Sequence, residues 1–538
     1  ELQVDDQAYL EASGDIIHGS ISAGTKSGNV TLVTSEKVSS SDDTKRISAS
    51  EIVVRAGSDV SLNIDARSLE IETAGTGDVD VDAVGSLTIA DAKLARGASS
   101  ISVEGDLVAE KVYALAPGNE LRLVSQEGSI EIGDVRAGFR SEVSADASKT
   151  ISMLDGGRVT ADAVDVSAGR GLTLDLRANS LEASVTKGDI SVQEVDELLV
   201  KKLHLSGSGV LKSGGDLRML EAVGSGRASL LAESGADLFL GDFDFGESGV
   251  LGFNASGKVV SLEEKTLTAG EIVVRATDRA ILSTAAQKLD VTVSGAGKLS
   301  VVESDGLSIS TDLAELEFFR TKGAGDVSLV ALGHIALTDV SLANGSFTAD
   351  VGGSLTTEVL SLLSDGKGIS LKTAGSMSLG EVDAGVAGKI SVFSGGSLHA
   401  LGKGLKAKEL QLTAGGDVFA DISVAEAVLR VTGAGDVYLK EADALQLSDA
   451  KLSDGSLTVE AGGDLRVSQA STEGEARTIA LDAQGGSLFV GEVDFGANGN
   501  GRLVASGSVE QIRGKRFVAG QAEVFAGDDV VLVTSLDE

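Results

Sequence analysis

Three carboxylates near the start of the chain alternate with valines, in a pattern that could bind a divalent cation. Asp78, Asp80 and Asp82 are separated by Val79 and Val81. In a β-strand this spacing places all three aspartates on one face, and calcium prefers carboxylate oxygens as ligands. The competing interpretation is a solvated strand face, since no ordered calcium-binding repeat is present. Calcium is the one cofactor that the residues suggest.

Other patterns look catalytic only at first sight. The segment Asp242–Gly246 reads DFDFG and contains the Asp-Phe-Gly of protein kinases, but no glycine-rich loop, lysine strand or catalytic loop accompanies it. Alternation instead predicts that Phe243 and Phe245 point inward and the aspartates outward. The histidines lie far apart, without metal-ligand spacing, at His18, His204, His334 and His399. We therefore expect neither a metal centre nor an enzyme.

Two phenylalanines stand at corresponding places 250 residues apart, at Phe239 and Phe489. If the aliphatic residues on either side of each ring point inward, both rings point outward. Exposed aromatic rings at regular spacing could make lateral contacts with a partner or a second copy. The alternative is a shifted register that buries both rings.

The elements that must position these residues are short strands in a repeated unit. Three stretches share one pattern, with 28 residues between the opening glycine and the next glycine of the same type: 77–107, 325–355 and 435–465. Each contains alternating aliphatic pairs such as Val437 and Leu439, interrupted at glycine. Alternation places every second side chain on one face, and a single unit cannot bury that face alone. Stacked copies can, so the repeat predicts a solenoid.

The same glycine-plus-aliphatic signal recurs along the whole chain, usually at intervals of 19 to 23 residues. We predict one continuous all-β domain over residues 1–538. It would be a right-handed parallel β-helix (β-solenoid) of about 24 coils, forming an elongated rod. The segment Ser39–Lys45 is predicted to be a bulging turn. Asp312–Phe319 is interpreted as strand rather than helix.

A longer repeat lies above the single turn. Leu238–Gly246 returns as Leu488–Gly496, and Gly77 returns as Gly325, 248 residues later. The chain is therefore predicted to contain a partial module at 1–76 and two modules at 77–324 and 325–538. Each full module would consist of two halves of about 110 residues, because whole turns that touch only their neighbours duplicate easily.

Composition limits the classes of partner. The formal net charge is −36, and such a surface repels nucleic acids and anionic membranes. Cysteine is absent, which excludes disulfides and agrees with an extracellular location. No apolar run is long enough for a transmembrane helix. The chain starts at Glu1 without an initiator methionine, which we interpret as a piece of something longer.

The motifs G-[DS]-[VIL]-x-[VIL] and AGG-[DS]-L resemble those of filamentous-haemagglutinin-like large exoproteins. Stretches that carry the resemblance are Ser394–Leu398 (SGGSL), Ala414–Val418 (AGGDV) and Glu460–Leu465 (EAGGDL). The resemblance covers nearly the whole chain. It implies a β-helical fibre at the bacterial surface that mediates adhesion and is not an enzyme. The family's amino-terminal secretion domain is not evident, and its asparagine-rich turns are scarce.

These observations predict the structural shaft of a large secreted or cell-surface fibrous protein, adhesin-like, which spaces or presents a binding element. The alternative is a subunit of an extracellular filament or sheath, which would stack through the uncapped strands Glu1–Val4 and Val530–Val533. Partners would be other copies, end to end or laterally, or a cell-surface or polysaccharide ligand. A polysaccharide lyase or hydrolase is less favoured, because long loops and sugar-stacking aromatics are few.

Overall fold

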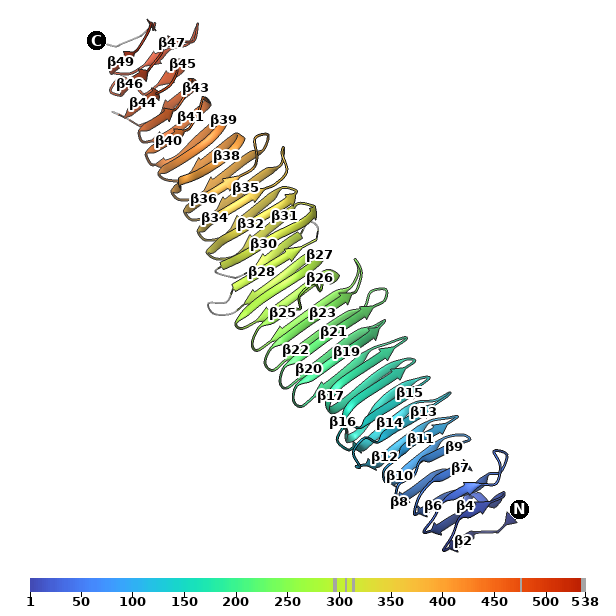
Figure 1. The fold of residues 1–538 in the computed structure, drawn as a ribbon. Coiled ribbons are helices and arrows are strands. Elements are labelled where there is room, and N and C mark those ends of the chain that lie inside the picture. The colour runs from blue at the N-terminus through green and yellow to red at the C-terminus, as the bar shows by residue number, and fades with distance from the viewer. Residues whose placement is uncertain (294–297, 305–306, 312–314, 475–476, 534–538) are drawn as a thin grey trace. The chain divides into compact units, whose positions relative to one another are not determined.

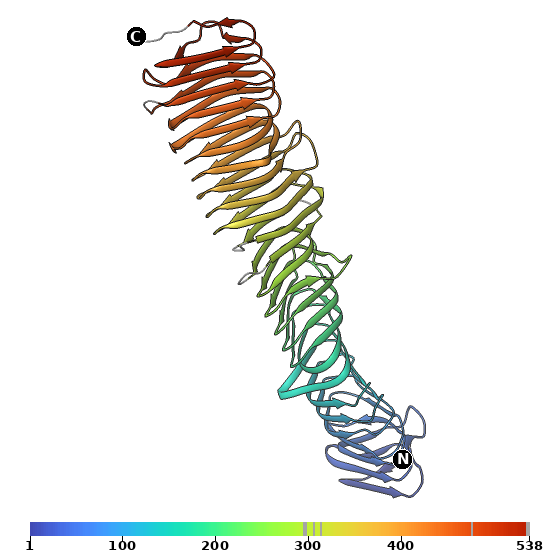
Figure 2. The same ribbon diagram turned by 60° about the vertical axis from the view of Figure 1, so that its left-hand side comes forward.

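A computed structural model describes residues 1–293, 298–304, 307–311, 315–474 and 477–533. Every regular element in these ranges is a β-strand. The chain divides into two compact units, Glu1–Val273 and Val274–Glu538. In each unit the strands stack as successive turns, as Figure 1 and the turned view in Figure 2 show.

The strands of the first unit, up to the one that contains the division, are β1 (Leu2–Gln3), β2 (Gln7–Ala12), β3 (Ile16–His18), β4 (Ile21–Thr34), β5 (Val38–Ser40), β6 (Ile47–Ala56), β7 (Val60–Asp65), β8 (Ser68–Thr73), β9 (Val79–Ala83), β10 (Leu87–Lys93), β11 (Ala98–Val103), β12 (Leu107–Ala114), β13 (Glu120–Ser125), β14 (Ile130–Ala137), β15 (Glu142–Ala147), β16 (Thr150–Ala168), β17 (Gly171–Val185), β18 (Ile190–Glu194), β19 (Leu198–Leu205), β20 (Ser208–Ser213), β21 (Leu217–Gly224), β22 (Ser229–Ser234), β23 (Leu238–Asp244), β24 (Val250–Ala255), β25 (Val259–Ser261) and β26 (Leu267–Ala276).

The strands of the second unit are β27 (Arg279–Val293), β28 (Lys298–Glu303), β29 (Leu307–Thr311), β30 (Glu315–Ala324), β31 (Val327–Ala331), β32 (Ile335–Asn344), β33 (Phe347–Val351), β34 (Leu355–Leu362), β35 (Gly368–Thr373), β36 (Met377–Asp383), β37 (Lys389–Ser394), β38 (Leu398–Ala414), β39 (Val418–Ala434), β40 (Val437–Glu441), β41 (Leu445–Asp454), β42 (Leu457–Ala461), β43 (Leu465–Thr472), β44 (Thr478–Ala483), β45 (Leu488–Asp494), β46 (Asn500–Ala505), β47 (Val509–Gln511), β48 (Phe517–Val518), β49 (Gln521–Ala526) and β50 (Val530–Val531).

Most strands pair in parallel with the strand two places along the sequence, which belongs to the next turn. In the first unit the partners in successive turns include Val60, Val79, Ser99, Leu121 and Val143, so a turn takes 19 to 22 residues there. The chain makes about 25 turns in all. The predicted all-β parallel solenoid is therefore confirmed, close to the expected number of coils.

The core of each unit is a set of inward-facing aliphatic columns. Leu62, Val81, Ile101 and Leu123 are register partners in four successive turns, and each is at most 2% exposed. Burying such a side chain contributes about 1.5–3 kcal/mol. A turn can cover its own core only when another turn lies above it and below it, which is why the stack is the stable unit.

The segment that contains DFDFG follows the predicted alternation. Phe243 and Phe245 are each 1% exposed, and Phe243 packs edge-to-face against Phe253 with the ring centroids 5.6 Å apart. Asp242 and Asp244 lie on the outside of β23. The two rings are therefore core residues of the solenoid.

Corners of the solenoid bring backbone of adjacent turns close together, and this explains the recurring glycine. Gly455 has φ +142°, and a Cβ atom placed on it would lie 1.9 Å from the carbonyl oxygen of Gly435 in the preceding turn. The residue after the corner glycine has a second task. Asp436 accepts a hydrogen bond at Oδ1 from the amide of Ser456 in the next turn, at 2.8 Å.

The same corner bond recurs in both units. Asp78 accepts from the amide of Ala98 at 2.9 Å, and Asp326 accepts from Ser346 at 2.7 Å. Serine replaces aspartate at Ser86, whose hydroxyl oxygen accepts from the amide of Asp106. A G-[DS] pair therefore fits a corner because glycine permits the close approach and the side-chain oxygen pairs a backbone amide that faces it.

Surplus residues leave the stack as short loops. The predicted bulging turn at Ser39–Lys45 is confirmed from Ser41 on, where the amide of Lys45 closes a turn on the carbonyl of Asp42, while Ser39 and Ser40 belong to β5. Of the predicted strand Asp312–Phe319, residues 315–319 lie in β30, as expected. Residues 312–314 lie outside the described residues.

The longer repeat has structural counterparts within each unit. β23 and β45 are each followed by a glycine in the left-handed region, Gly246 at φ 59° and Gly496 at φ 74°. Later in the sequence, loops of the same form follow, closed by the amides of Lys265 and Lys515 on the carbonyls three residues before them. The module boundaries at 76/77 and 324/325 stay a prediction.

We expect Gly455→Ala to lower the free energy of unfolding by about 2–4 kcal/mol, because it adds left-handed strain and a clash with backbone. Gly333→Ala is the matched control in the same unit, since no atom lies within 4 Å of the added Cβ and its φ is not left-handed. Urea unfolding of both variants measures the difference. Equal stability of the two would contradict the corner explanation.

Candidate functional site

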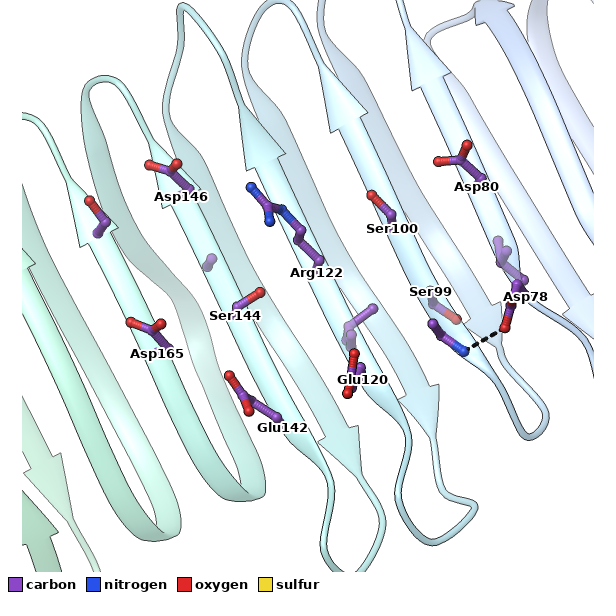
Figure 3. Close-up of a pocket in the computed structure, with 15 residues that line it drawn as sticks. Asp78, Asp80, Ser99, Ser100, Glu120, Arg122, Glu142, Ser144, Asp146 and Asp165 are labelled. Atoms are coloured by element: carbon purple, nitrogen blue, oxygen red, sulfur yellow. Dashed lines mark hydrogen bonds between the residues drawn. The ribbon is translucent and has the colours of Figure 1, made fainter. Parts of the chain in front are cut away.

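A hollow of about 580 Å³ lies on the first unit, over β9, β11, β13, β15 and the last part of β16 (Figure 3). Its lining contains six carboxylates and one arginine, with serine and alanine between them. The charged residues are Asp78, Asp80, Glu120, Arg122, Glu142, Asp146 and Asp165. It is the strongest concentration of polar side chains around a described cavity, and is therefore the site to examine.

The hollow follows from one outward column of the parallel ladder. Asp80, Ser100, Arg122, Ser144 and Asp165 are register partners in five successive turns, and Figure 3 shows them following one another across the strands. Serine is much shorter than arginine or aspartate, so the surface sinks where serine occupies the column. The shape thus depends on which residue types the stacking brings together.

Charge repulsion and partial burial perturb two of these carboxyl groups. Burial raises the pKa of Asp80, and the neighbouring carboxylate of Asp82 raises it further. Burial also raises the pKa of Asp165, with added repulsion from Glu182 and Asp146. A carboxyl group with a raised pKa in the folded state favours folding most when protonated, so this part of its contribution is lost as the pH rises through that pKa.

The predicted calcium triad is divided between two roles. Asp78 lies at the corner before β9, where Oδ1 accepts the hydrogen bond from Ala98, whereas Asp80 and Asp82 face outward from β9. Within the described ranges, no group of three or more histidine, cysteine or acidic residues is placed to hold a metal ion. Calcium binding by these three aspartates stays a prediction.

Phe239 and Phe489 both point outward, in the register that the sequence suggested. Leu238 and Leu240 on either side of Phe239 are fully buried, and Phe239 itself is half-buried. The Nζ atom of Lys258 lies 5.4 Å from its ring centroid, and the guanidinium of Arg466 lies 5.9 Å from the ring of Phe489. Each ring is therefore partly covered by a cation from an adjacent turn.

The four histidines have four separate environments. His18 is 4% exposed, with Nδ1 2.8 Å from the carbonyl oxygen of Gly19, and burial lowers its pKa. His334 stands in a corner column, where Nδ1 accepts from the amide of Ser354. His399 stacks on Phe419, and His204 lies 3.9 Å from Glu221. No two of these histidines face each other in a catalytic pair.

Two features escaped the sequence analysis. One is the corner bond made by Asp or Ser after glycine, for which the repeated G-[DS] pair was the available signal. The other is a set of buried glutamates at the ends of strands, Glu194, Glu303 and Glu441. Their signal was present too, because each stands at an inward position of an alternating run, as in Ile190, Val192 and Glu194.

No helix in the described part of the chain is long and apolar enough to cross a membrane. Comparison with known proteins returns no significant match to a protein-family model, a curated protein or a solved structure. The resemblance to filamentous-haemagglutinin-like exoproteins therefore stays a prediction.

Asp165→Asn should raise the melting temperature at neutral pH and low salt, because it removes a carboxylate that is repelled by its neighbours. The gain should shrink in high salt, which screens the repulsion, and near pH 4, where the carboxyl is largely protonated. Glu127→Gln, at an exposed corner outside the hollow, is the control for charge alone. An equal gain in both variants would show that net charge rather than the hollow sets the effect.

If the outward phenylalanines make lateral contacts, Phe239→Ser combined with Phe489→Ser should abolish lateral association of the concentrated protein and leave the circular-dichroism spectrum unchanged. Light scattering over a concentration series measures the association. Phe419→Ser, which removes another half-buried outward ring, is the control. Unchanged association in the double variant would dispose of the hypothesis.

Proposed function

We propose that this chain is a structural shaft segment of a large secreted or cell-surface fibrous protein, and that it spaces or presents a binding element. The observation that carries this proposal is the use of polar groups at the corners. Backbone amides there are paired by side chains of the neighbouring turn, as Asp417, Asp436 and Ser456 do in three successive turns. Side chains at these corners thus hold one turn to the next.

The outward surface supports the same proposal. Ion pairs on it often join adjacent turns, such as Lys212 with Glu233 at 2.6 Å and Asp350 with Lys372 at 2.9 Å. Exposed pairs of this kind add little stability each. They do place opposite charges along the stacking direction, and the many remaining carboxylates keep the surface soluble.

The hollow gives weaker support to an enzyme. Glycoside hydrolysis needs an acid and a second carboxylate on opposite sides of the scissile bond, and the hollow does contain several carboxylates. Its floor, however, is serine and alanine, and no aromatic ring is among its lining residues. We therefore favour the structural role over catalysis.

A shaft built from equivalent turns should tolerate the loss of one complete turn. Val437 and Leu457 are register partners, so deletion of residues 437–456 joins Asp436 to Leu457 in register. Asp436 would then face the amide of Thr478, which Ser456 pairs in the intact chain. We expect a folded protein with nearly unchanged melting temperature, shorter by about 4.8 Å along the stack in X-ray scattering.

Deletion of residues 437–446 is the matched control, because it removes only part of a turn and places the corners out of register. We expect that variant to aggregate or to unfold at a much lower temperature. Equal behaviour of the two deletions would contradict a modular shaft. Sizing at several concentrations separates the shaft from a filament subunit, which would polymerise reproducibly, and release of sugar from a polysaccharide panel would favour the enzyme.

A further inference from the structure

Buried glutamates occur at equivalent places in both units, at the last residue of a short straight strand. Glu194 ends β18 and Glu441 ends β40, and each is 3% exposed. Glu303 ends β28 and is fully buried. At the corresponding end of β9 stands Ala83. Carboxylates are rarely buried this deeply unless they are paired or hydrogen-bonded, so these residues need an explanation.

The carboxylates accept hydrogen bonds from backbone amides. Oε2 of Glu194 accepts from the amide of Ala178 in the preceding turn at 2.8 Å, and Oε1 accepts from Val195 and Asp196 at 2.8 and 3.3 Å. Oε2 of Glu441 accepts from the amide of Val424 at 2.7 Å. Oε1 of Glu441 accepts from the amide two residues further along, at 3.2 Å.

The glutamates follow unusually short turns. Val159 and Leu176 are register partners only 17 residues apart, and so are Leu405 and Ile422. The strands that contain the amide donors, β17 and β39, continue around the corner without a loop. Where Ala83 stands instead, the next amide, of Val84, bonds to the carbonyl of Ile64. The glutamate thus supplies an acceptor at corners that have been shortened.

The amides of Ala178 and Val424 would lose this acceptor without the carboxylate. A buried amide left unpaired costs about 1–3 kcal/mol. Keeping a charge in the core is also costly, because no salt bridge to Glu194 or Glu441 is found in the described part of the chain. The carboxyl group therefore satisfies the backbone at the expense of burying its own charge.

Burial raises the pKa of Glu194 and of Glu441. The amide hydrogen bonds lower it, and the nearby carboxylates of Asp196 and Asp443 raise it. A glutamate whose pKa is raised on folding stabilises the fold most below its unfolded pKa, near about 4.3. That contribution is lost as the pH rises through the raised pKa.

The surrounding charges come from each element packed against the two glutamates. They are exposed or half-buried, and acids outnumber bases. Around Glu194 they are Asp162 of β16, Asp175 and Arg177 of β17, Asp196 and Glu197 after β18, and Lys212 of β20; around Glu441 they are Asp421 and Glu426 of β39, Lys440 of β40, Asp443 after it and Glu460 of β42. Arg177 lies 3.7 Å from Asp196.

We propose that Glu194 and Glu441 are proton-responsive caps, which hold the shortened corners more firmly in mild acid than at neutral pH. On acidification each carboxylate takes up one proton from solvent, and the buried charge disappears. The corner then opens less often, while corners that carry alanine at this place do not change in this way. The inference concerns local stability and stands apart from the proposed role of the chain.

Hydrogen exchange of the full chain, followed by mass spectrometry at about pH 5 and about pH 8 and corrected for intrinsic rates, tests the proposal. Protection of segments 171–198 and 418–443 should fall towards higher pH, by at most about tenfold per pH unit for one linked proton. The segment 60–84, which contains Ala83, should change much less. Equal protection at both pH values in the two glutamate segments would overturn the proposal.

The two sites serve as controls for each other. Glu194→Gln should abolish the pH dependence at 171–198 and leave that at 418–443, and Glu441→Gln should do the reverse. If the glutamine amide disturbs the corner, Glu194→Ala and Glu441→Ala, which introduce the residue type found at Ala83, provide the same comparison. Glu131→Gln, at an exposed position of β14, should change neither segment. Persistence of the pH dependence at a substituted site would also overturn the proposal.

Discussion

The close approach of backbone at the corners is the constraint on which the rest of the structure depends. Adjacent strands of a sheet lie about 4.8 Å apart, and at a corner the chain of one turn passes directly over that of the turn before. A side chain at Gly455 would overlap the carbonyl of Gly435. Glycine at this place permits the contact, and the following Asp436 pairs an amide of the next turn. Once the corners are in register, the inward residues of successive turns form continuous columns.

Much of this fold could be predicted from the sequence, because strand alternation and glycine spacing are local signals. The inward positions of Val437, Leu439 and Phe243 follow from alternation alone, and the structure confirms them. The candidate site could not be predicted in the same way. Its shape depends on lateral neighbours in other turns, and turn length varies from 17 residues between Val159 and Leu176 to 23 between Leu465 and Leu488. Alternation says whether a side chain points inward, but not which side chain lies beside it.

Parallel stacking also determines how the acidic surface is arranged. Residues in one outward column are about 4.8 Å apart along the stack, so a column of carboxylates alone would repel itself. The column through the hollow alternates types, with Ser100 and Ser144 between the charged residues Asp80, Arg122 and Asp165. Short neutral side chains separate the charges and at the same time leave the surface concave. The hollow is thus explained by electrostatic spacing in a strongly acidic solenoid, without a requirement for a ligand.

Variation in turn length needs two different structural remedies. A long turn can extrude its surplus as a loop, as between β25 and β26, where Lys265 reaches back to Asp242 at 2.7 Å. A short turn has nothing to extrude, and its corner amide must find another acceptor. An inward glutamate reaches that amide because its side chain is long enough to cross the corner from the next turn, which aspartate and serine at the corner itself need not do. The glutamates therefore belong to the same system as the corner glycines and aspartates, since all of them satisfy backbone where one turn gives way to the next.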